Sequence, residues 1–311
     1  MNTRNIGASV YAKLKNMARE RGLDMPVMLR RYAQERFLYR LSVSPVASDF
    51  CVKGGLLLTA YNSGNLLRPT EDIDFNGFAR GATMETLRQA LDIVIATPVA
   101  DDGVVFFTDT MTIKKEHTGI IGGGKITFSA QIHTARVDVR VDVGFGNAIT
   151  PDARYLEMPT LLDTVAPRPT VLAYPLETVI AEKLHAMVEF GFLNTRIKDH
   201  FDIWTLINIH DFAGADLVSA INNTFEVQNR LIPDLPLACL TEEYAQEKEV
   251  AWTIFLDKID ERNRVPFTDV VSELSDFVWP IMETAQAGIS TDIVWSAGGG
   301  WMKKPSLVLL P

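Results

Sequence analysis

The sequence predicts an α/β domain built on a mixed sheet, followed by a mostly helical domain. Up to about residue 150, segments with the two-residue alternation of β-strands are interleaved with helical segments. Beyond Pro167 and Pro169 the hydrophobic spacing becomes helical. A length of 311 residues is enough for about two domains. We therefore expect an α/β domain with basic N-terminal helices over 1–165 and a helical domain over 166–311.

Two helices open the chain. The hydrophobic spacing predicts the first over 9–22, ending at Gly22, and the second from Pro26 to Leu41. Residues 1–40 carry nine Lys and Arg against three acidic residues, a net charge of +6, whereas the whole chain is −9 and the remainder is therefore −15. The arginines of these helices form either a solvated helix face or a docking surface for a polyanion.

The rest of the predicted α/β domain mixes strands and helices. The expected elements are a short strand from Cys51, a glycine turn and helix to Tyr61, a strand over 71–75, a helix over 83–97, and strands over 104–116 and 125–144. The helical domain is expected to contain helices over 175–190, 196–210, 213–227, 241–259 and 268–287. The tail from Gly298 to the apolar run 307–310 is either a terminal strand or a packing arm.

Composition narrows the class of protein. An overall charge of −9 argues against a protein that holds nucleic acid through global positive potential. The two cysteines have no Cys or His at metal-ligand spacing, so we expect free buried thiols in a reducing compartment. The chain has neither an apolar signal-peptide core nor a run of about 18–20 apolar residues. We therefore expect a cytoplasmic protein that makes no membrane contact.

A pair of carboxylates is the first sign of chemistry. Asp72 and Asp74 stand two apart in a predicted strand, so they share one face while Ile73 and Phe75 take the other. Two like charges this close are stable mainly when a divalent cation lies between them. An exposed strand end would explain the pair about as well, and glycosyltransferases use the same triplet to hold a nucleotide sugar through a metal.

Two further features strengthen the metal hypothesis. Gly54 and Gly55 lie between an apolar strand and an apolar helix, where a helix N-terminus could approach phosphate oxygens, although the glycines could also simply make a tight turn. The segment 136–143 alternates fully, with valines on one face and charged residues on the other. Asp142 is the candidate third carboxylate of a two-metal site. Asp138 is expected to pair with the neighbouring arginines.

The predicted helical domain adds charged groups on apolar stripes. Lys183 emerges from a mostly apolar flank, where it either snorkels to solvent or reaches a triphosphate. Asp199 and Asp202 share a helical stripe with apolar residues and therefore need partners. Arg196 and Lys198 are spaced to form salt bridges with them, although the stripe could equally direct both carboxylates into a cleft.

An ordered set of five motifs resembles the AbiEii/AbiGii-type toxin family of nucleotidyltransferases, a branch of the DNA polymerase β superfamily. The motifs are Lys53-Gly-Gly-Leu-Leu-Leu, Arg68-Pro-Thr-Glu-Asp-Ile-Asp-Phe, Val141-Asp-Val-Gly-Phe, Glu182-Lys-Leu and Arg196-Ile-Lys-Asp-His-Phe-Asp-Ile. The resemblance covers roughly residues 10–215. Two departures from the generic superfamily pattern are a longer gap between Gly55 and Asp72 and a Gly-Gly pair in place of Gly-Ser.

The resemblance implies roles for particular residues. Gly54 and Gly55 would hold the triphosphate, Asp72 and Asp74 would bind catalytic Mg²⁺ or Mn²⁺, and Lys183 would match the essential lysine. Either Asp199 or Asp202 would match the essential acidic position. The further candidates for nucleotide contacts, which stand in the same motifs, are Lys53, Arg68, Thr70, Arg196 and Lys198.

The resemblance also implies a function. We expect a metal-dependent enzyme that transfers NMP from an NTP to RNA, most plausibly to the 3′ end of tRNA. It would act as the toxin of a type IV toxin–antitoxin system used in abortive infection and phage defence, with a winged-helix antitoxin as a possible partner. The basic N-terminal segment fits an RNA acceptor. The alternatives are transfer to a small molecule or a protein hydroxyl, and a non-catalytic nucleotide-binding module.

Overall fold

The chain divides into two compact units, each made of two separate segments of the sequence. The computed structural model describes residues 5–62, 68–78, 83–116 and 122–304. The first unit comprises 1–147 and 153–174, and the second comprises 148–152 and 175–311. The chain therefore enters the second unit briefly after Asn147, returns to the first, and leaves it finally after Tyr174. The apolar tail run 307–310 lies outside the described residues.

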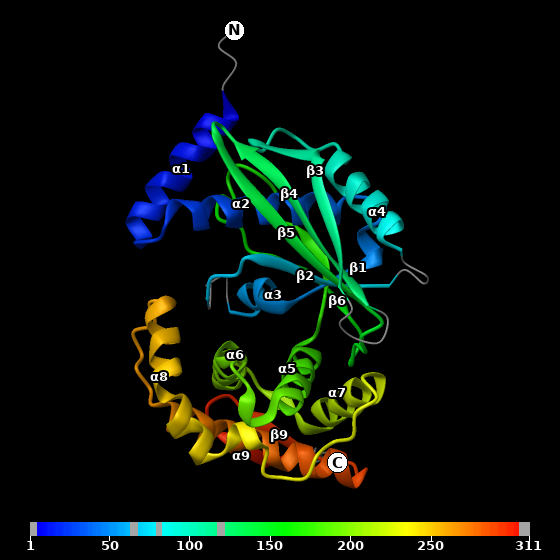
Figure 1. Cartoon of the computed structure of the whole chain (residues 1–311), viewed down its shortest axis with the longest axis vertical. Coiled ribbons are helices and arrows are strands. Elements are labelled where there is room, and N and C mark those ends of the chain that lie inside the picture. The colour runs from blue at the N-terminus through cyan, green and yellow to red at the C-terminus, as the bar shows by residue number, and fades with distance from the viewer. Residues whose placement is uncertain (1–4, 63–67, 79–82, 117–121, 305–311) are drawn as a thin grey trace, which may run out of the picture. The chain divides into compact units, whose positions relative to one another are not determined.

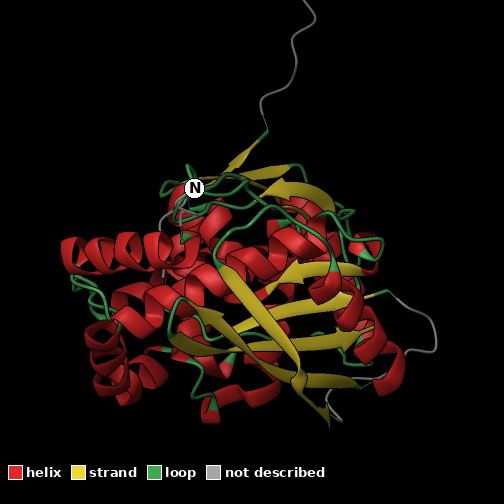
Figure 2. Cartoon of the chain, turned by 90° about the horizontal axis from the view of Figure 1, so that it is seen from above, coloured by secondary structure: helices red, strands yellow, loops and turns green. Residues whose placement is uncertain are grey.

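A seven-stranded mixed sheet forms the centre of the first unit, with strand order β3-β4-β5-β2-β1-β7-β6 among the described residues. Its strands are β1 (Phe50–Lys53), β2 (Asp72–Gly77), β3 (Val104–Glu116), β4 (Gly123–Ile132), β5 (Ala135–Phe145), β6 (Arg154–Glu157) and β7 (Thr170–Ala173). The helices are α1 (Ile6–Arg21), α2 (Met25–Ser42), α3 (Gly54–Tyr61) and α4 (Met84–Ala96). The parallel pairs are β2 with β5 and β1 with β7. The long strands can be followed as yellow arrows in Figure 2.

Helix α2 covers one face of the long strands. It crosses behind β4 and β5 in Figure 1, and the Phe37 ring lies 5.4 Å from that of Phe128 and 6.2 Å from that of Phe106. The buried valines Val139, Val141 and Val143 of β5 line the same side. The predicted alternation of β5 is therefore present, and its charged residues lie on the opposite face of the sheet.

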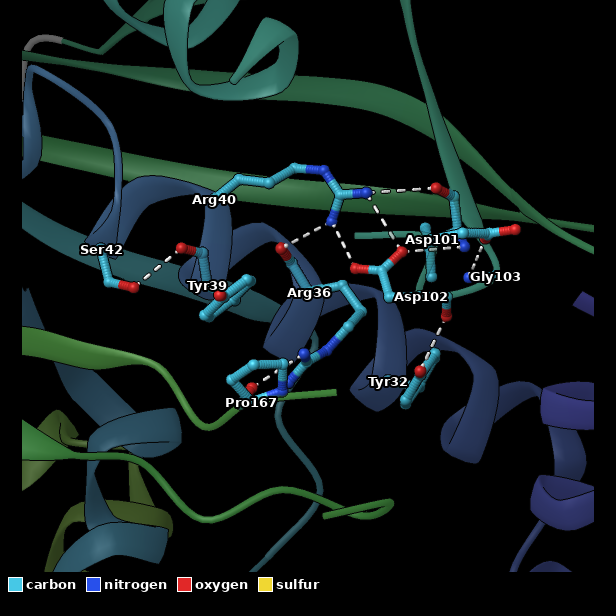
Figure 3. A network of polar contacts seen from close by, with 10 residues as sticks. Tyr32, Arg36, Tyr39, Arg40, Ser42, Asp101, Asp102, Gly103 and Pro167 are labelled. Atoms are coloured by element: carbon cyan, nitrogen blue, oxygen red, sulfur yellow. Dashed lines mark hydrogen bonds and ion pairs between the residues drawn. The ribbon is translucent and has the colours of Figure 1, made fainter. Parts of the chain in front are cut away.

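Two of the four arginines of α2 are internal, which differs from both expectations for these two positions. Arg36 and Arg40 are buried. Arg40 binds both carboxylate oxygens of Asp102, at 2.8 and 3.1 Å, while Arg36 donates to the Pro167 carbonyl (Figure 3). The 3.6-residue spacing identified the helix correctly, but it could not show that two of its charged side chains are buried in the protein interior. Among the described residues of this segment, the exposed cations lie on α1, at Lys13, Lys15, Arg19 and Arg21.

The second unit is mostly helical, with a small sheet of order β10-β9-β8 among its described residues. The α-helices are α5 (Leu176–Phe190), α6 (Ile197–Ile209), α7 (Gly214–Val227), α8 (Glu242–Lys258) and α9 (Phe267–Ala287). The strands are β8 (Phe212–Ala213), β9 (Ile293–Ser296) and β10 (Gly300–Lys303). Phe277 of α9 packs on Trp295 and Trp301 of the sheet, at centroid distances of 5.0 and 5.4 Å.

The predicted fold class is confirmed, and the differences concern strands. The segment 125–144 forms two strands because the chain reverses after Ile132, where His133 adopts a positive φ of 55°. The short strands β6 to β10 were not all predicted, because two to four residues give too little alternation to recognise. Helix α3 begins at Gly54 itself, without an intervening turn. Both cysteines are buried, and neither forms a disulfide among the described residues. No helix of the described residues is long and apolar enough to span a membrane.

Candidate active site

Two of the predicted carboxylates are direct neighbours on the sheet. β2 and β5 run parallel, and their register places Asp74 opposite Asp142 and Asp72 opposite Arg140. Register partners on adjacent parallel strands project from the same face, so Asp72, Asp74 and Asp142 share one side of the sheet. The sequence separation of Asp74 and Asp142 gave no direct sign of this pairing. Their adjacency is produced by the parallel crossover from β2 to β5.

Lysines flank this carboxylate pair on both sides. Antiparallel β1 places Lys53 opposite Asp74, and antiparallel β4 places Lys125 opposite Asp142. The Lys125 Nζ lies 4.0 Å from Asp142 Oδ2, and the Lys53 Nζ lies 5.6 Å from the Tyr174 ring centroid. Lys53 was predicted from its motif, but Lys125 was missed because only strand register relates it to Asp142. One row across four strands therefore reads Lys, Asp, Asp, Lys, which limits the repulsion between the acids.

The double glycine brings the start of α3 close to two charged side chains. Gly54 has a φ of +71°, and a Cβ built on it would lie 2.0 Å from Asp74 Oδ2. A Cβ on Gly55 would lie 2.9 Å from a terminal nitrogen of Arg68. Any larger residue at 54 would therefore need both a strained backbone and displacement of the Asp74 carboxylate. The glycines thus allow the helix N-terminus, Asp74 and Arg68 to come together.

Three polar side chains hold the backbone and the carboxylate at the start of β2 through hydrogen bonds. The Thr70 hydroxyl donates to the Asp72 carbonyl at 2.9 Å, so this predicted nucleotide contact orients the backbone beside Asp72. Gln34 of α2 is buried and donates to the Glu71 carbonyl at 3.0 Å. The Glu71 carboxylate in turn accepts from Arg140 at 2.7 Å. Gln34 was not singled out by the sequence, and Arg140 was expected to pair with Asp138 instead of Glu71, because their partners lie on distant segments.

A second cluster lies in the second unit, between α5 and α6. The Lys183 ammonium donates to Asp199 Oδ1 and to Asp202 Oδ2, each at 2.7 Å, and the Arg196 Nε lies 2.8 Å from Asp199 Oδ2. Both carboxylates are buried, and the Lys183 side chain is 12% exposed. The predicted pair of Arg196 with Asp199 is therefore present. Lys183 of α5 binds both acids. Lys198 is exposed on α6, the helix that carries the two acids.

The charge on Asp199 is maintained by these neighbours. Burial by itself would raise the pKa of the Asp199 carboxyl, but the Lys183 ammonium and the Arg196 guanidinium outweigh burial and hold that pKa below its ordinary value. The adjacent His200 is completely buried, with Nε2 3.0 Å from the Cys239 carbonyl, and burial lowers its pKa, which favours a neutral imidazole. Lys183, Asp199 and Arg196 thus form an ion cluster, and the neutral His200 adds no charge beside it.

The depressed pKa of Asp199 predicts a specific loss of stability in acid. A folded-state pKa below the unfolded value contributes stability at pH values above about 4, and this contribution is lost as the pH falls through the lower folded-state pKa. Asp199→Asn should therefore flatten the acid limb of a curve of melting temperature against pH. The exposed Asp276→Asn, in the same unit, is the control and should keep the wild-type slope. An unchanged acid limb in Asp199→Asn would contradict the assigned pKa shift.

The remaining sequence predictions have mixed outcomes. The structure brings together Lys53, Gly54, Gly55, Asp74 and Asp142 within the first unit, and Lys183, Arg196, Asp199 and Asp202 within the second; their catalytic roles stay predictions. Asp138 accepts from the Ser129 hydroxyl at 3.3 Å, so its expected pairing with arginines is wrong. Arg136 lies over the Phe107 ring instead. Among the described residues, no group of three or more acidic, His or Cys side chains could by itself hold a metal ion.

The chain is similar to known proteins in sequence and in structure. A family model described as "Nucleotidyl transferase AbiEii toxin, Type IV TA system" matches residues 36–273, well over half of the chain. Among solved structures, the chain is similar to MenT4, a nucleotidyltransferase toxin from Mycobacterium tuberculosis H37Rv, with 15% identity, a TM-score of 0.51, and coverage of 90% of this chain and 99% of that one. It is also similar to JHP933 from Helicobacter pylori, with 14% identity, a TM-score of 0.47, and coverage of 86% and 94%. Comparison with curated proteins finds no match.

Proposed function

Because the chain belongs to the AbiEii family of nucleotidyltransferase toxins of type IV toxin–antitoxin systems, we propose that it transfers NMP from an NTP to an RNA acceptor with the help of Mg²⁺ or Mn²⁺. The observation that carries this proposal is the pairing of Asp74 with Asp142 beside the N-terminus of α3. The 3′ end of tRNA is the proposed acceptor. Membership of the family implies an antitoxin partner, which we propose to be a winged-helix protein.

The donor set suits a hard divalent cation. Mg²⁺ at nucleotide sites is usually held by one or two carboxylates, with substrate phosphates and waters completing its shell. Asp74 and Asp142, with Asp72 one step along β2, supply carboxylates of this kind. This explains why the protein side chains need not form a complete cage by themselves. When bound, the cation would neutralise charge on the phosphates and on the attacking oxygen.

The residues around the carboxylates are suited to bind a triphosphate. The N-terminus of α3 begins at Gly54, where backbone N–H groups have no partner within the helix and attract anions. Lys53 and Arg68 add positive charge beside this helix start. Their task is to position the NTP and to offset its charge, which is the main requirement of phosphoryl and nucleotidyl transfer. No covalent nucleophile from the protein is required.

The identity of the acceptor distinguishes this proposal from its closest alternative, which is transfer to a small molecule or to a protein hydroxyl. The net charge of −9 favours that alternative. The test supplies each of the four α-labelled NTPs, with Mg²⁺, to the wild-type protein together with purified tRNA or with cell lysate. We expect the α-labelled NMP to be joined to the 3′ end of tRNA, while unlabelled pyrophosphate leaves. Omission of the metal should abolish the labelling.

The matched variants are Asp72→Ala and Asp109→Ala. Asp109 is an exposed acid on β3 of the same unit, so its variant should retain transfer, while Asp72→Ala should lose it. Label recovered only on protein or on a small molecule would refute the RNA acceptor. Metal-independent labelling would refute the proposed role of the carboxylates. A non-catalytic module would give the same cellular effect with and without Asp72→Ala.

A further inference from the structure

The long strands of the first unit present a polar face on the side opposite α2. Strand register places on this face the residues that pair across β3, β4 and β5. We call it the open face and define it by Val105, Phe107, Thr112, Lys114, Lys125, Thr127, Ser129, Gln131, Arg136, Asp138 and Arg140. The cationic side chains among them are exposed. Figure 1 shows β4 and β5 in front of α2, with this face toward the viewer.

The open face carries two lysines directly opposite each other on neighbouring strands. The register sets Lys114 directly opposite Lys125, and like charges opposite each other on neighbouring strands are destabilising. Arg136 and Arg140 bring the cations of the face to four, of which Lys125 lies 4.0 Å from Asp142 and Arg140 binds Glu71 at 2.7 Å. Lys114 and Arg136 are therefore the cations of this face on which the argument for an anionic ligand depends. Asp142 offsets the charge of Lys125, so Lys114 is the cation of this row that a bound anion would neutralise.

The chemistry of the other residues fits a nucleic acid strand. Arg136 lies 5.1 Å from the ring centroid of Phe107, which leaves an aromatic ring and a guanidinium together at the end of the face farther from Asp142. Aromatic rings with neighbouring arginines stack on bases without selecting a sequence. Thr112, Thr127 and Gln131 offer hydroxyl and amide groups, which are common partners of phosphate and sugar oxygens.

The register also connects the open face to the carboxylates. Lys125 is opposite Asp142, and the next row on the same face, one step of about 7 Å along the strands, contains Thr127, Arg140 and Asp72. We propose that the open face binds the phosphate backbone of the single-stranded 3′ segment of an RNA acceptor, whose end reaches Asp72, Asp74 and Asp142. This rests on the proposed function, and it assigns Lys114 and Arg136 to acceptor binding.

The test compares this surface with the exposed cations of α1. The first variant is Lys114→Glu/Arg136→Glu, its charge-retaining counterpart is Lys114→Arg/Arg136→Lys, and the matched control is Lys15→Glu/Arg19→Glu on α1. Each protein is titrated with a fluorescent single-stranded RNA oligonucleotide at several salt concentrations. Binding of a fluorescent NTP is measured on the same samples. All substituted side chains are exposed or lie on the surface of the sheet, and thermal unfolding verifies the fold.

We expect Lys114→Glu/Arg136→Glu to weaken RNA binding at least tenfold. The dependence of log affinity on log salt should become shallower by about one for each phosphate contact removed. NTP binding should be unchanged, and the charge-retaining variant should restore RNA affinity. The control on α1 should bind RNA like the wild type.

Three results would overturn the inference. RNA affinity unchanged in the first variant, or an equal loss in the α1 control, would show that the open face is not the acceptor surface. Failure of the charge-retaining variant to recover binding, with the fold intact, would show that charge is not the cause. The proposed function fails separately, if the wild type binds NTP but labels only protein or a small molecule. If the wild type labels RNA but one of the binding results above is obtained, only the assignment of the open face to acceptor binding is refuted.

Discussion

Asp74→Asn is expected to abolish NMP transfer while leaving the fold of the first unit in place. Asp74 pairs in register with Asp142 and lies against Gly54, so its carboxylate is at the centre of the proposed metal and phosphate site. An amide of the same shape retains the packing but removes the negative charge. Stabilisation by a metal is worth several kcal/mol, and each 1.36 kcal/mol is a factor of about ten in rate. We expect a loss of at least about a hundredfold.

The measurement is the initial rate of label transfer from an α-labelled NTP at saturating metal. Asp109→Asn, which makes the same change at an exposed position of the same unit, is the control and should transfer at the wild-type rate. The apparent affinity for Mn²⁺ should also fall in Asp74→Asn but not in the control. A variant that retains more than a tenth of the activity would remove Asp74 from the proposed metal site.

Lys183→Met should destabilise the second unit by about 3–5 kcal/mol. The ammonium of Lys183 is 2.7 Å from both Asp199 and Asp202, whose carboxylates are buried. Removing one partner of a buried ion cluster leaves uncompensated charge of the same sign in the interior, which is the costly case. Methionine fills a similar volume, so the effect comes from charge and hydrogen bonding. Urea unfolding followed by tryptophan fluorescence is specific here, because all five tryptophans lie at position 204 or beyond.

A compensated variant distinguishes this cause from a packing defect. Lys183→Met combined with Asp199→Asn and Asp202→Asn removes the like charges together with their cation, and should recover a large part of the lost stability. Lys258→Met, at an exposed position of α8 in the same unit, should change the unfolding free energy by less than about 0.5 kcal/mol. A loss below about 1 kcal/mol in Lys183→Met, or a triple variant as unstable as the single one, would contradict the account.

Local signals in the sequence predicted much of the fold and part of the site. Thr83 caps α4 through reciprocal contacts with Thr86, and Pro175 precedes α5, so both helices begin within one residue of their predicted starts. The alternation around Asp72 and Asp74 placed both acids on one face of a strand, as the structure has them. These features depend on neighbours within a few residues, and a single sequence contains that information.

Other parts of the site depend on pairings between distant segments. Asp142 faces Asp74 only because β5 joins β2 in parallel, and Lys125 was missed because it is related to Asp142 by antiparallel register. Arg40 looked like a surface cation, but Asp102, far away in the sequence, neutralises it in the interior. Lys183 was placed correctly as an amine on an apolar flank, yet its contacts with two acids of α6 come from helix packing, which periodicity does not specify.

Because each unit is made of two separate segments, no single cut in the chain separates one unit from the other. A chain shortened to end at residue 165 would lack β7, which pairs in parallel with β1, the strand that carries Lys53 and leads into Gly54. A chain ending at Tyr174 would keep β7, but its residues 148–152 would lose their contact with Thr178. The Thr178 hydroxyl accepts from the Thr150 backbone N–H and donates to the Thr150 carbonyl. Neither unit is therefore a continuous stretch of sequence, and a protease cut near residue 150 would sever both.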